Sequence, residues 1–269
     1  MIKDTVINLK FFNMDKIKKD SIVVLLGKRN TGKSFLIRDI LFHKSSIPLG
    51  TVISRTDHLV HYYDKFIPSM LIHKSYDPVI TEKVLKRQTL AVNKNWKNPY
   101  AFLLLDDCLS EAGSWKRDES IKEIFFNGRH YKLLFILAMQ SPMGIPPEFR
   151  TNVDFTFILK NNNKSDREKI FKNYAGMFKS LEQFEIILDS CTEDYNCLVV
   201  DNVSLSNRLE DCVFFYKAKM HDSFRICSDE LWDNNRRYSG SSLMESHTTS
   251  SVVSTKRNKY IINKKNQKI

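Results

Sequence analysis

Apolar runs alternate along the chain with stretches in which apolar residues recur every three or four positions. Short, nearly continuous apolar runs are typical of strands buried on both faces, and the wider spacing is typical of helices that pack one face against a sheet. Strands that alternate with helices predict an α/β fold with a mostly parallel central sheet flanked by helices. The predicted strands are residues 21–26, 51–54, 101–106, 133–139, 153–159, 197–200 and 212–216, with a further possible strand near 70–73.

Helical spacing falls between these strands. Helices are predicted for residues 33–42, 79–92, 120–127 and about 166–188, with a short helix near Glu230. Three prolines within residues 141–147 predict irregular structure there. Residues 238–269 are rich in serine, threonine and lysine and offer little to bury. We therefore expect one domain over residues 1–237, followed by a disordered basic tail.

The charge of the chain favours a polyanionic partner. The 269 residues carry a formal net charge of +11, and 42% of them are hydrophobic, which is enough for a substantial core. Residues 240–269 contain six basic residues and one acidic residue, a net charge of +5. This segment fits non-specific contact with nucleic acid phosphates, although a solubilising or dispensable end explains the same composition.

The cysteines and the apolar segments exclude several classes of protein. Five cysteines occur without a CxxC pair or nearby histidines at zinc-finger spacing, so reduced thiols are expected. The chain has no apolar run of roughly 18 residues, as a membrane span requires, and its first twelve residues lack the apolar centre of a signal peptide. We expect a soluble, intracellular protein with no membrane span.

A glycine-rich loop joins the first strong strand to the helix that follows. It satisfies G-x-x-x-x-G-K-[ST] without a mismatch, a pattern whose backbone N–H groups surround nucleotide phosphates. In this motif the lysine reaches the β- and γ-phosphates and the hydroxyl binds Mg²⁺, so ATP and Mg²⁺ are the expected cofactors. The eight residues are Gly27, Lys28, Arg29, Asn30, Thr31, Gly32, Lys33 and Ser34.

Two later strands end in polar residues suited to hydrolysis. AFLLLD ends at Asp106, a candidate Mg²⁺ ligand, and is followed by Asp107, a candidate to orient or deprotonate the attacking water. LLFILAM is followed by Gln140, whose amide can hydrogen-bond both water and γ-phosphate. The order of the three motifs predicts an NTP-hydrolysing site.

A guanine-reading loop is an alternative interpretation of NNNKSD. Asn163, Lys164 and Asp166 match N-K-x-D, as in small GTPases. Such GTPases also carry D-x-x-G after the acidic strand, and here Asp106 and Asp107 are followed three positions later by Leu109 and Ser110. A polar loop that starts a helix is the simpler interpretation.

The combination GKRNTGKS, LLLDDC, NGRHYKLLFILAMQS and PPEFRTNVDFTFIL, within residues 20–217, resembles the genome-packaging ATPases of nucleocytoplasmic large DNA viruses. These are the poxvirus-type members of the FtsK/HerA-type translocase superfamily. The resemblance implies a RecA-like P-loop fold with an extra strand between the two nucleotide-contacting strands. It further implies a ring, often a hexamer, that hydrolyses ATP to thread double-stranded DNA through a capsid portal, in the host cytoplasm and the virion.

The same resemblance assigns roles to single residues. It implies that Lys33 and Ser34 bind nucleotide and metal, that Asp106 and Asp107 form the acid pair, and that Gln140 is the sensor. Wider superfamily members usually have glutamate as the second acid, so Asp107 departs from the common pattern.

Ring motors commonly complete each site with an arginine from a neighbouring subunit. Arg129, before the sensor strand, and Arg150, after it, are the candidates, and an ordinary surface charge is the competing interpretation of each. Two other functions stay open: a nucleotide kinase, and a non-motor ATP switch. A kinase of this fold needs an arginine-rich lid, and no arginine cluster follows the sensor strand.

Overall fold

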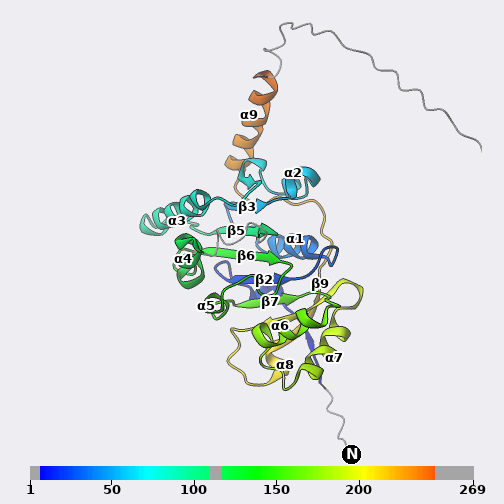
Figure 1. The fold of residues 1–269 in the computed structure, drawn as a ribbon. Coiled ribbons are helices and arrows are strands. Elements are labelled where there is room, and N and C mark those ends of the chain that lie inside the picture. Colours follow the sequence, from blue (N-terminus) through cyan, green and yellow to red (C-terminus); the bar gives the residue numbers. More distant parts are fainter. Residues whose placement is uncertain (1–6, 109–116, 246–269) are drawn as a thin grey trace, which may run out of the picture.

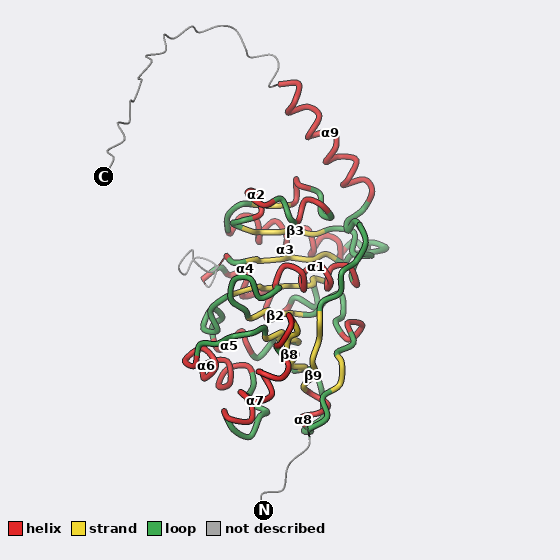
Figure 2. Tube along the Cα trace, turned by 90° about the vertical axis from the view of Figure 1, so that its right-hand side faces the viewer, coloured by secondary structure: helices red, strands yellow, loops and turns green. Residues whose placement is uncertain are grey.

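The strands of the described residues form one sheet; Figure 1 shows several of them lying one above another, and Figure 2 shows the molecule turned by 90°. The computed structural model describes residues 7–108 and 117–245. Within them the strand order is β1-β9-β8-β7-β2-β6-β5-β3-β4. The strands are β1 (Lys10–Phe11), β2 (Ile22–Leu26), β3 (Gly50–Ser54), β4 (Ile72–His73), β5 (Ala101–Asp106), β6 (Leu133–Met139), β7 (Phe155–Ile158), β8 (Asn196–Asp201) and β9 (Val213–Lys217).

The sheet is mostly parallel, as predicted. Among the described strands, β8 alone runs against its neighbours, since β7 and β9 both pair with it in the antiparallel direction. The central strand β2 pairs with β7 on one side and β6 on the other, and β6 separates β2 from β5. The expected extra strand between the two nucleotide-contacting strands is therefore β6, and the carboxyl ends of β2, β6 and β5 meet at one edge.

Helices cover both faces of the sheet (Figure 1). The helix α1 packs on one face, whereas α3, α4, α6 and α7 contribute to the core of the other. The helices are α1 (Lys33–His43), α2 (Asp57–Val60), α3 (Pro78–Asn93), α4 (Glu119–Asn127), α5 (Pro147–Arg150), α6 (Lys164–Tyr174), α7 (Leu181–Cys191), α8 (Leu209–Cys212) and α9 (Asp229–Glu245).

Burial on both faces explains why β2 reads as an uninterrupted apolar run. All five of its residues are buried. Val23 and Leu25 join the core beneath α1, and Ile22, Val24 and Leu26 join the core on the opposite face, as side-chain alternation along a strand requires. Because β2 is packed on both faces, the position of the loop that follows it is fixed relative to the sheet.

Two predicted elements differ from the observed ones for local reasons. The helical region expected over 166–188 is two helices, because the chain turns at residues 175–180 and Ser180 restarts the helix by accepting a hydrogen bond from the N–H of Gln183. The proline-rich segment is irregular until Pro147, which begins the short helix α5; proline is compatible with a first helical turn.

The last helix is longer than the sequence suggested. Trp232 is buried, and its indole N–H donates to the Ile226 carbonyl at 2.9 Å, so the start of α9 is fixed against the domain. Once a helix has started, each further residue adds at little cost, and α9 continues to Glu245, beyond the expected boundary at 237. Figures 1 and 2 show it projecting away from the sheet. Residues 246–269, the rest of the predicted tail, lie outside the described residues.

The structure shows the state of the cysteines and the apolar character of the helices. All five cysteines are free thiols, and four of them are buried. Among the described helices, none combines the length and the apolar character that crossing a bilayer requires.

Candidate active site

The glycine loop curls between the end of β2 and the start of α1, as its motif predicts. A Cβ on Gly27 would lie 2.6 Å from the Thr31 hydroxyl oxygen and 3.0 Å from the Leu159 Cβ, so no side chain fits there. Gly32 has φ +96°, a conformation that favours glycine. Because Gly32 also gives α1 no side-chain cap, the first N–H groups of the helix point to the loop interior, as an anion site requires.

Lys33 bends back over the loop. Its Nζ donates to the carbonyl oxygens of Gly27 and Lys28, each at 2.7 Å. Burial lowers the pKa of Lys33, and the carboxylates of Asp106 and Asp107 act in the opposite direction. The ammonium group thus lies in the field of both acids, next to the backbone that would hold the phosphates.

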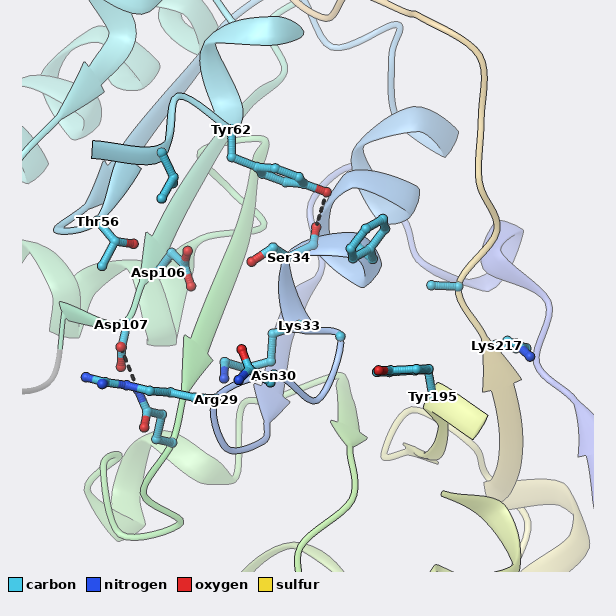
Figure 3. Close-up of a pocket in the computed structure, with 15 residues that line it drawn as sticks. Arg29, Asn30, Lys33, Ser34, Thr56, Tyr62, Asp106, Asp107, Tyr195 and Lys217 are labelled. Carbon is cyan, nitrogen blue, oxygen red and sulfur yellow. Dashed lines mark hydrogen bonds between the residues drawn. The ribbon is translucent and has the colours of Figure 1, made fainter. Parts of the chain in front are cut away.

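The two acids at the end of β5 lie in different environments. Asp106 is buried, and burial raises its pKa, an effect that the hydrogen bond from the Tyr63 hydroxyl partly offsets. Asp107 follows with φ 55°, so the chain turns sharply and directs the second carboxylate away from the first. Figure 3 shows Asp106 facing Ser34 and Asp107 at the lower side of the cavity.

Gln140 is joined directly to the second acid. Its Nε2 donates to Asp107 Oδ2 at 2.6 Å (Figure 3, dashed line). The two residues are 33 positions apart in the sequence, and β6 brings them together because it pairs with β5 along its whole length. The structure thus brings together Lys33, Ser34, Asp106, Asp107 and Gln140, as expected from the order of the motifs.

Two adjacent tyrosines that the sequence analysis missed hold this arrangement. Tyr63 donates from its hydroxyl to Asp106 Oδ2 at 2.8 Å. Tyr62 donates to the Ser34 carbonyl at 3.2 Å, as Figure 3 shows. The Asp57 carboxylate fixes the turn by accepting from both tyrosine N–H groups, at 2.9 and 2.8 Å. Burial raises the pKa of Tyr62 to about 12 and that of Tyr63 well above its usual value, so both hydroxyls stay protonated donors.

The glycine loop, the acid pair, Gln140 and Tyr62 line one cavity of about 1080 Å³. We call two groups of its lining residues the inner wall and the outer wall. The inner wall consists of Lys33, Ser34, Asp106, Asp107 and Gln140, and the outer wall consists of Phe35, Val60, Tyr195, Lys217 and Ala218.

The outer wall is mostly apolar or aromatic. Tyr195 is 69% exposed, and it and its neighbour Asp194 both have positive φ. An ion pair between Asp194 and Lys217 joins this turn to the end of β9. The tyrosine ring is therefore presented to the cavity by a turn that a second strand holds in place.

Neither candidate arginine is among the described residues that line the cavity. Arg129 pairs with Asp154, whose other oxygen accepts from the N–H of Ile22 at the beginning of β2. Arg129 thus lies at the end of the sheet opposite the glycine loop, about 16 Å away along the five residues of β2. Arg150 donates to the Ile145 carbonyl at 2.9 Å and to the Asn173 side chain.

The N-K-x-D segment has a structural role. Asn163 is the N-cap of α6 and accepts a hydrogen bond from the N–H of Asp166 at 3.0 Å. The interpretation as a polar loop that starts a helix is confirmed. None of Asn163, Lys164 and Asp166 lines the 1080 Å³ cavity.

Related proteins come from viruses. The chain is 36% identical over 235 residues to uncharacterized protein L437 of Acanthamoeba polyphaga mimivirus, covering 84% of this chain and 82% of that protein. It is 38% identical over 227 residues to uncharacterized protein 075L of Invertebrate iridescent virus 6, covering 81% and 86%. This chain belongs to their family. No family model matches this chain.

The fold of this chain also occurs in a solved structure. The genome packaging NTPase B204 from Sulfolobus turreted icosahedral virus 2, in complex with ATP-gammaS, superposes with a TM-score of 0.55 and 19% identity. The match covers 76% of this chain and 100% of that one. The predicted P-loop α/β fold is confirmed, and in its fold the chain resembles a viral genome packaging NTPase.

Proposed function

We propose that this protein is an ATP-driven translocase that moves double-stranded DNA into a viral capsid. The observation that carries the proposal is the convergence of the glycine loop, the acid pair and Gln140 on one cavity at the carboxyl ends of β2, β5 and β6. A phosphate cradle alone would suit any nucleotide-binding protein. The acids and the amide opposite it supply what hydrolysis of the terminal phosphate needs.

The two walls suit the two ends of a nucleotide. The triphosphate lies against the inner wall, where the uncapped start of α1 and the Lys33 ammonium offset its charge. The base lies against the outer wall, where the Tyr195 ring offers a stacking surface. The oxygen ligands that Mg²⁺ prefers are available from the Ser34 hydroxyl and Asp106, which face each other (Figure 3). Bound there, Mg²⁺ neutralises charge on the β- and γ-phosphates.

Asp107 and Gln140 act on the attacking water. A carboxylate can orient the water and accept its proton, and the amide can hydrogen-bond both the water and the γ-phosphate. One oxygen of Asp107 is held by Gln140, so its other oxygen is the available proton acceptor. This division of roles makes Asp107 the general base and Gln140 the group that senses the terminal phosphate.

DNA as the partner is supported by charge and by similarity. The chain has a net charge of +11, and the backbone of a duplex offers a matching row of phosphates that any sequence supplies. The printed description of B204 is that of a genome packaging NTPase. By analogy with ring motors, several copies act together in the host cytoplasm, and Arg150 or Arg129 completes a neighbour's site.

The test is ATP turnover by the full-length protein with and without long double-stranded DNA. Turnover should rise several-fold with the duplex and should vanish in Lys33→Ala. Lys86→Ala, which removes a lysine that is 72% exposed on α3, is the matched control and should behave as wild type. A rate that does not respond to duplex would contradict the motor, and phosphate transfer to an added nucleoside would indicate a kinase.

The hydrogen bond between Gln140 and Asp107 favours one second candidate, a slow ATP switch that recruits partners. In this arrangement the amide already occupies an oxygen of the general base, a feature that suits slow turnover. A switch would hold ATP for long periods and hydrolyse it at the same low rate with or without DNA. The turnover assay therefore separates the two candidates.

A further inference from the structure

A second cluster of polar side chains lies on α1, away from its phosphate end. Asp39 and His43 are four residues apart and share one side of the helix. His221 reaches the same place from the segment after β9. One ligand atom from each of the three residues lies within 4.8 Å of the others, a grouping of metal-ligand side chains found among the described residues.

Two of the three separations between the ligand atoms lie near the value that a tetrahedral metal needs. His221 Nε2 lies 2.6 Å from Asp39 Oδ1, and His43 Nε2 lies 3.5 Å from the same oxygen. Zinc binds imidazole nitrogen and carboxylate oxygen at about 2.0–2.2 Å, so tetrahedral ligand atoms are about 3.3 Å apart. The two observed separations bracket this value, and an ion would move the His221 ring outward by less than about 1 Å.

The groups behind the cluster already hold its ligands in orientation. Asp39 is fully buried, and its second oxygen accepts from the Tyr216 hydroxyl and from the N–H of Lys219, both at 2.8 Å. The His221 ring stacks on Phe42 with a centroid separation of 3.6 Å. Outer partners of this kind fix ligand orientation in zinc sites. The His43 side chain is 30% exposed, so an ion can enter from solvent.

We propose that Asp39, His43 and His221 bind a zinc ion. Two imidazoles and one carboxylate suit Zn²⁺, whereas Mg²⁺ prefers oxygen ligands only, and three protein ligands leave one position for water. Asp39 lies about 9 Å along the helix axis from Lys33, so this ion is distinct from the one expected at the phosphates.

A zinc ion at this site connects α1 to the segment after β9, and both elements border the nucleotide cavity. The segment that carries His221 begins with Lys217 and Ala218, two residues of the outer wall. Arg38 already holds this segment through the carbonyl oxygens of His221 and Asp222, at 2.9 and 3.1 Å. The metal adds a second attachment between this segment and the helix that begins at the glycine loop.

The experiment is calorimetric titration of full-length, tag-free protein with Zn²⁺ after treatment with a chelator. Wild type should bind one equivalent and should unfold at a higher temperature with zinc. His43→Ala and His221→Ala should each weaken binding more than tenfold. Tyr216→Phe, which removes only an outer hydrogen bond, should weaken it about tenfold. His58→Ala, at an exposed histidine of α2, is the control and should bind as wild type.

Cobalt provides a readout that does not depend on stability. Co²⁺ in place of Zn²⁺ should give the visible absorption of a tetrahedral nitrogen and oxygen site, and that absorption should disappear in His43→Ala. If Zn²⁺ does not bind saturably, or binds equally well to His43→Ala and His221→Ala, the cluster is a hydrogen-bond network only and the proposal fails. Equal occupancy by Mg²⁺ would also overturn it.

Discussion

The inner and outer walls of the cavity are built in different ways. The inner wall comes from residues at or just after the carboxyl ends of β5 and β6, and from the first turn of α1, which the glycine loop joins to the neighbouring strand β2; the backbone ladder sets the spacing of these three strands. The outer wall comes from residues of α1, α2, the turn before β8 and the end of β9, which side-chain contacts such as the Asp194–Lys217 ion pair hold in place. In the proposed function, the groups that act on the phosphates are thus positioned by the sheet, and the expected contact with the base comes from segments held by side-chain interactions.

The largest effect should come from the inner wall. Asp107→Asn should reduce ATP turnover about 10²- to 10⁴-fold, because an amide cannot accept the proton from water at neutral pH. ATP binding, measured by equilibrium titration, should change little. Normal turnover by this variant would show that the general base is another group.

A smaller effect should come from Tyr63, which hydrogen-bonds Asp106 of the inner wall. Tyr63→Phe removes the hydrogen bond that lowers the pKa of Asp106, so that pKa should rise further. The carboxylate form is needed to hold Mg²⁺, and the acidic limb of the pH–rate profile should therefore move to higher pH. The Mg²⁺ concentration for half-maximal rate should also increase.

Tyr62→Phe provides the matched comparison for that variant, because its hydroxyl contacts the Ser34 carbonyl and not Asp106. Its acidic limb should stay in place. If both variants show the same pH profile as wild type, the tyrosine does not position the metal ligand.

Substitutions in the outer wall should change the KM for ATP. Tyr195→Ala should raise the KM for ATP about two- to tenfold, as expected for the loss of one aromatic contact, and should leave kcat nearly unchanged. Tyr195→Phe keeps the ring and should match wild type. A fall in kcat with constant KM would mean that Tyr195 acts on the reaction itself.

The smallest effect on turnover should come from the C-terminal tail, which belongs to neither wall. Removing residues 240–269 deletes a net charge of +5 and should weaken duplex binding modestly, most clearly at low salt. ATP turnover without DNA should not change. Unaltered duplex affinity at every salt concentration would show that the tail does not contact DNA.

The inner wall was predictable because each of its parts has a local signature. A glycine loop, an acid after an apolar strand and a glutamine after the next strand are all visible within a few residues, and parallel strands bring such ends together. The antiparallel position of β8 was not predictable, because strand order depends on long-range pairing.

The remaining site residues have no such signature. Tyr62 and Tyr63 stand in a turn without a motif, and their partners lie 28 and 43 positions away. His221 meets Asp39 across 182 positions. The identity of an arginine that acts between subunits depends on a contact with another chain, so Arg129 and Arg150 stay predictions.

The position of β6 has a consequence for natural variation in this protein. With β6 between β2 and β5, the gap from the glycine loop to the acid pair is two strand spacings, about 9.5 Å, and backbone hydrogen bonds alone set it. Amino-acid changes in the outer helices can loosen packing without widening that gap. Such changes should reduce the amount of folded protein that accumulates in a cell, while each folded molecule should keep its rate of turnover.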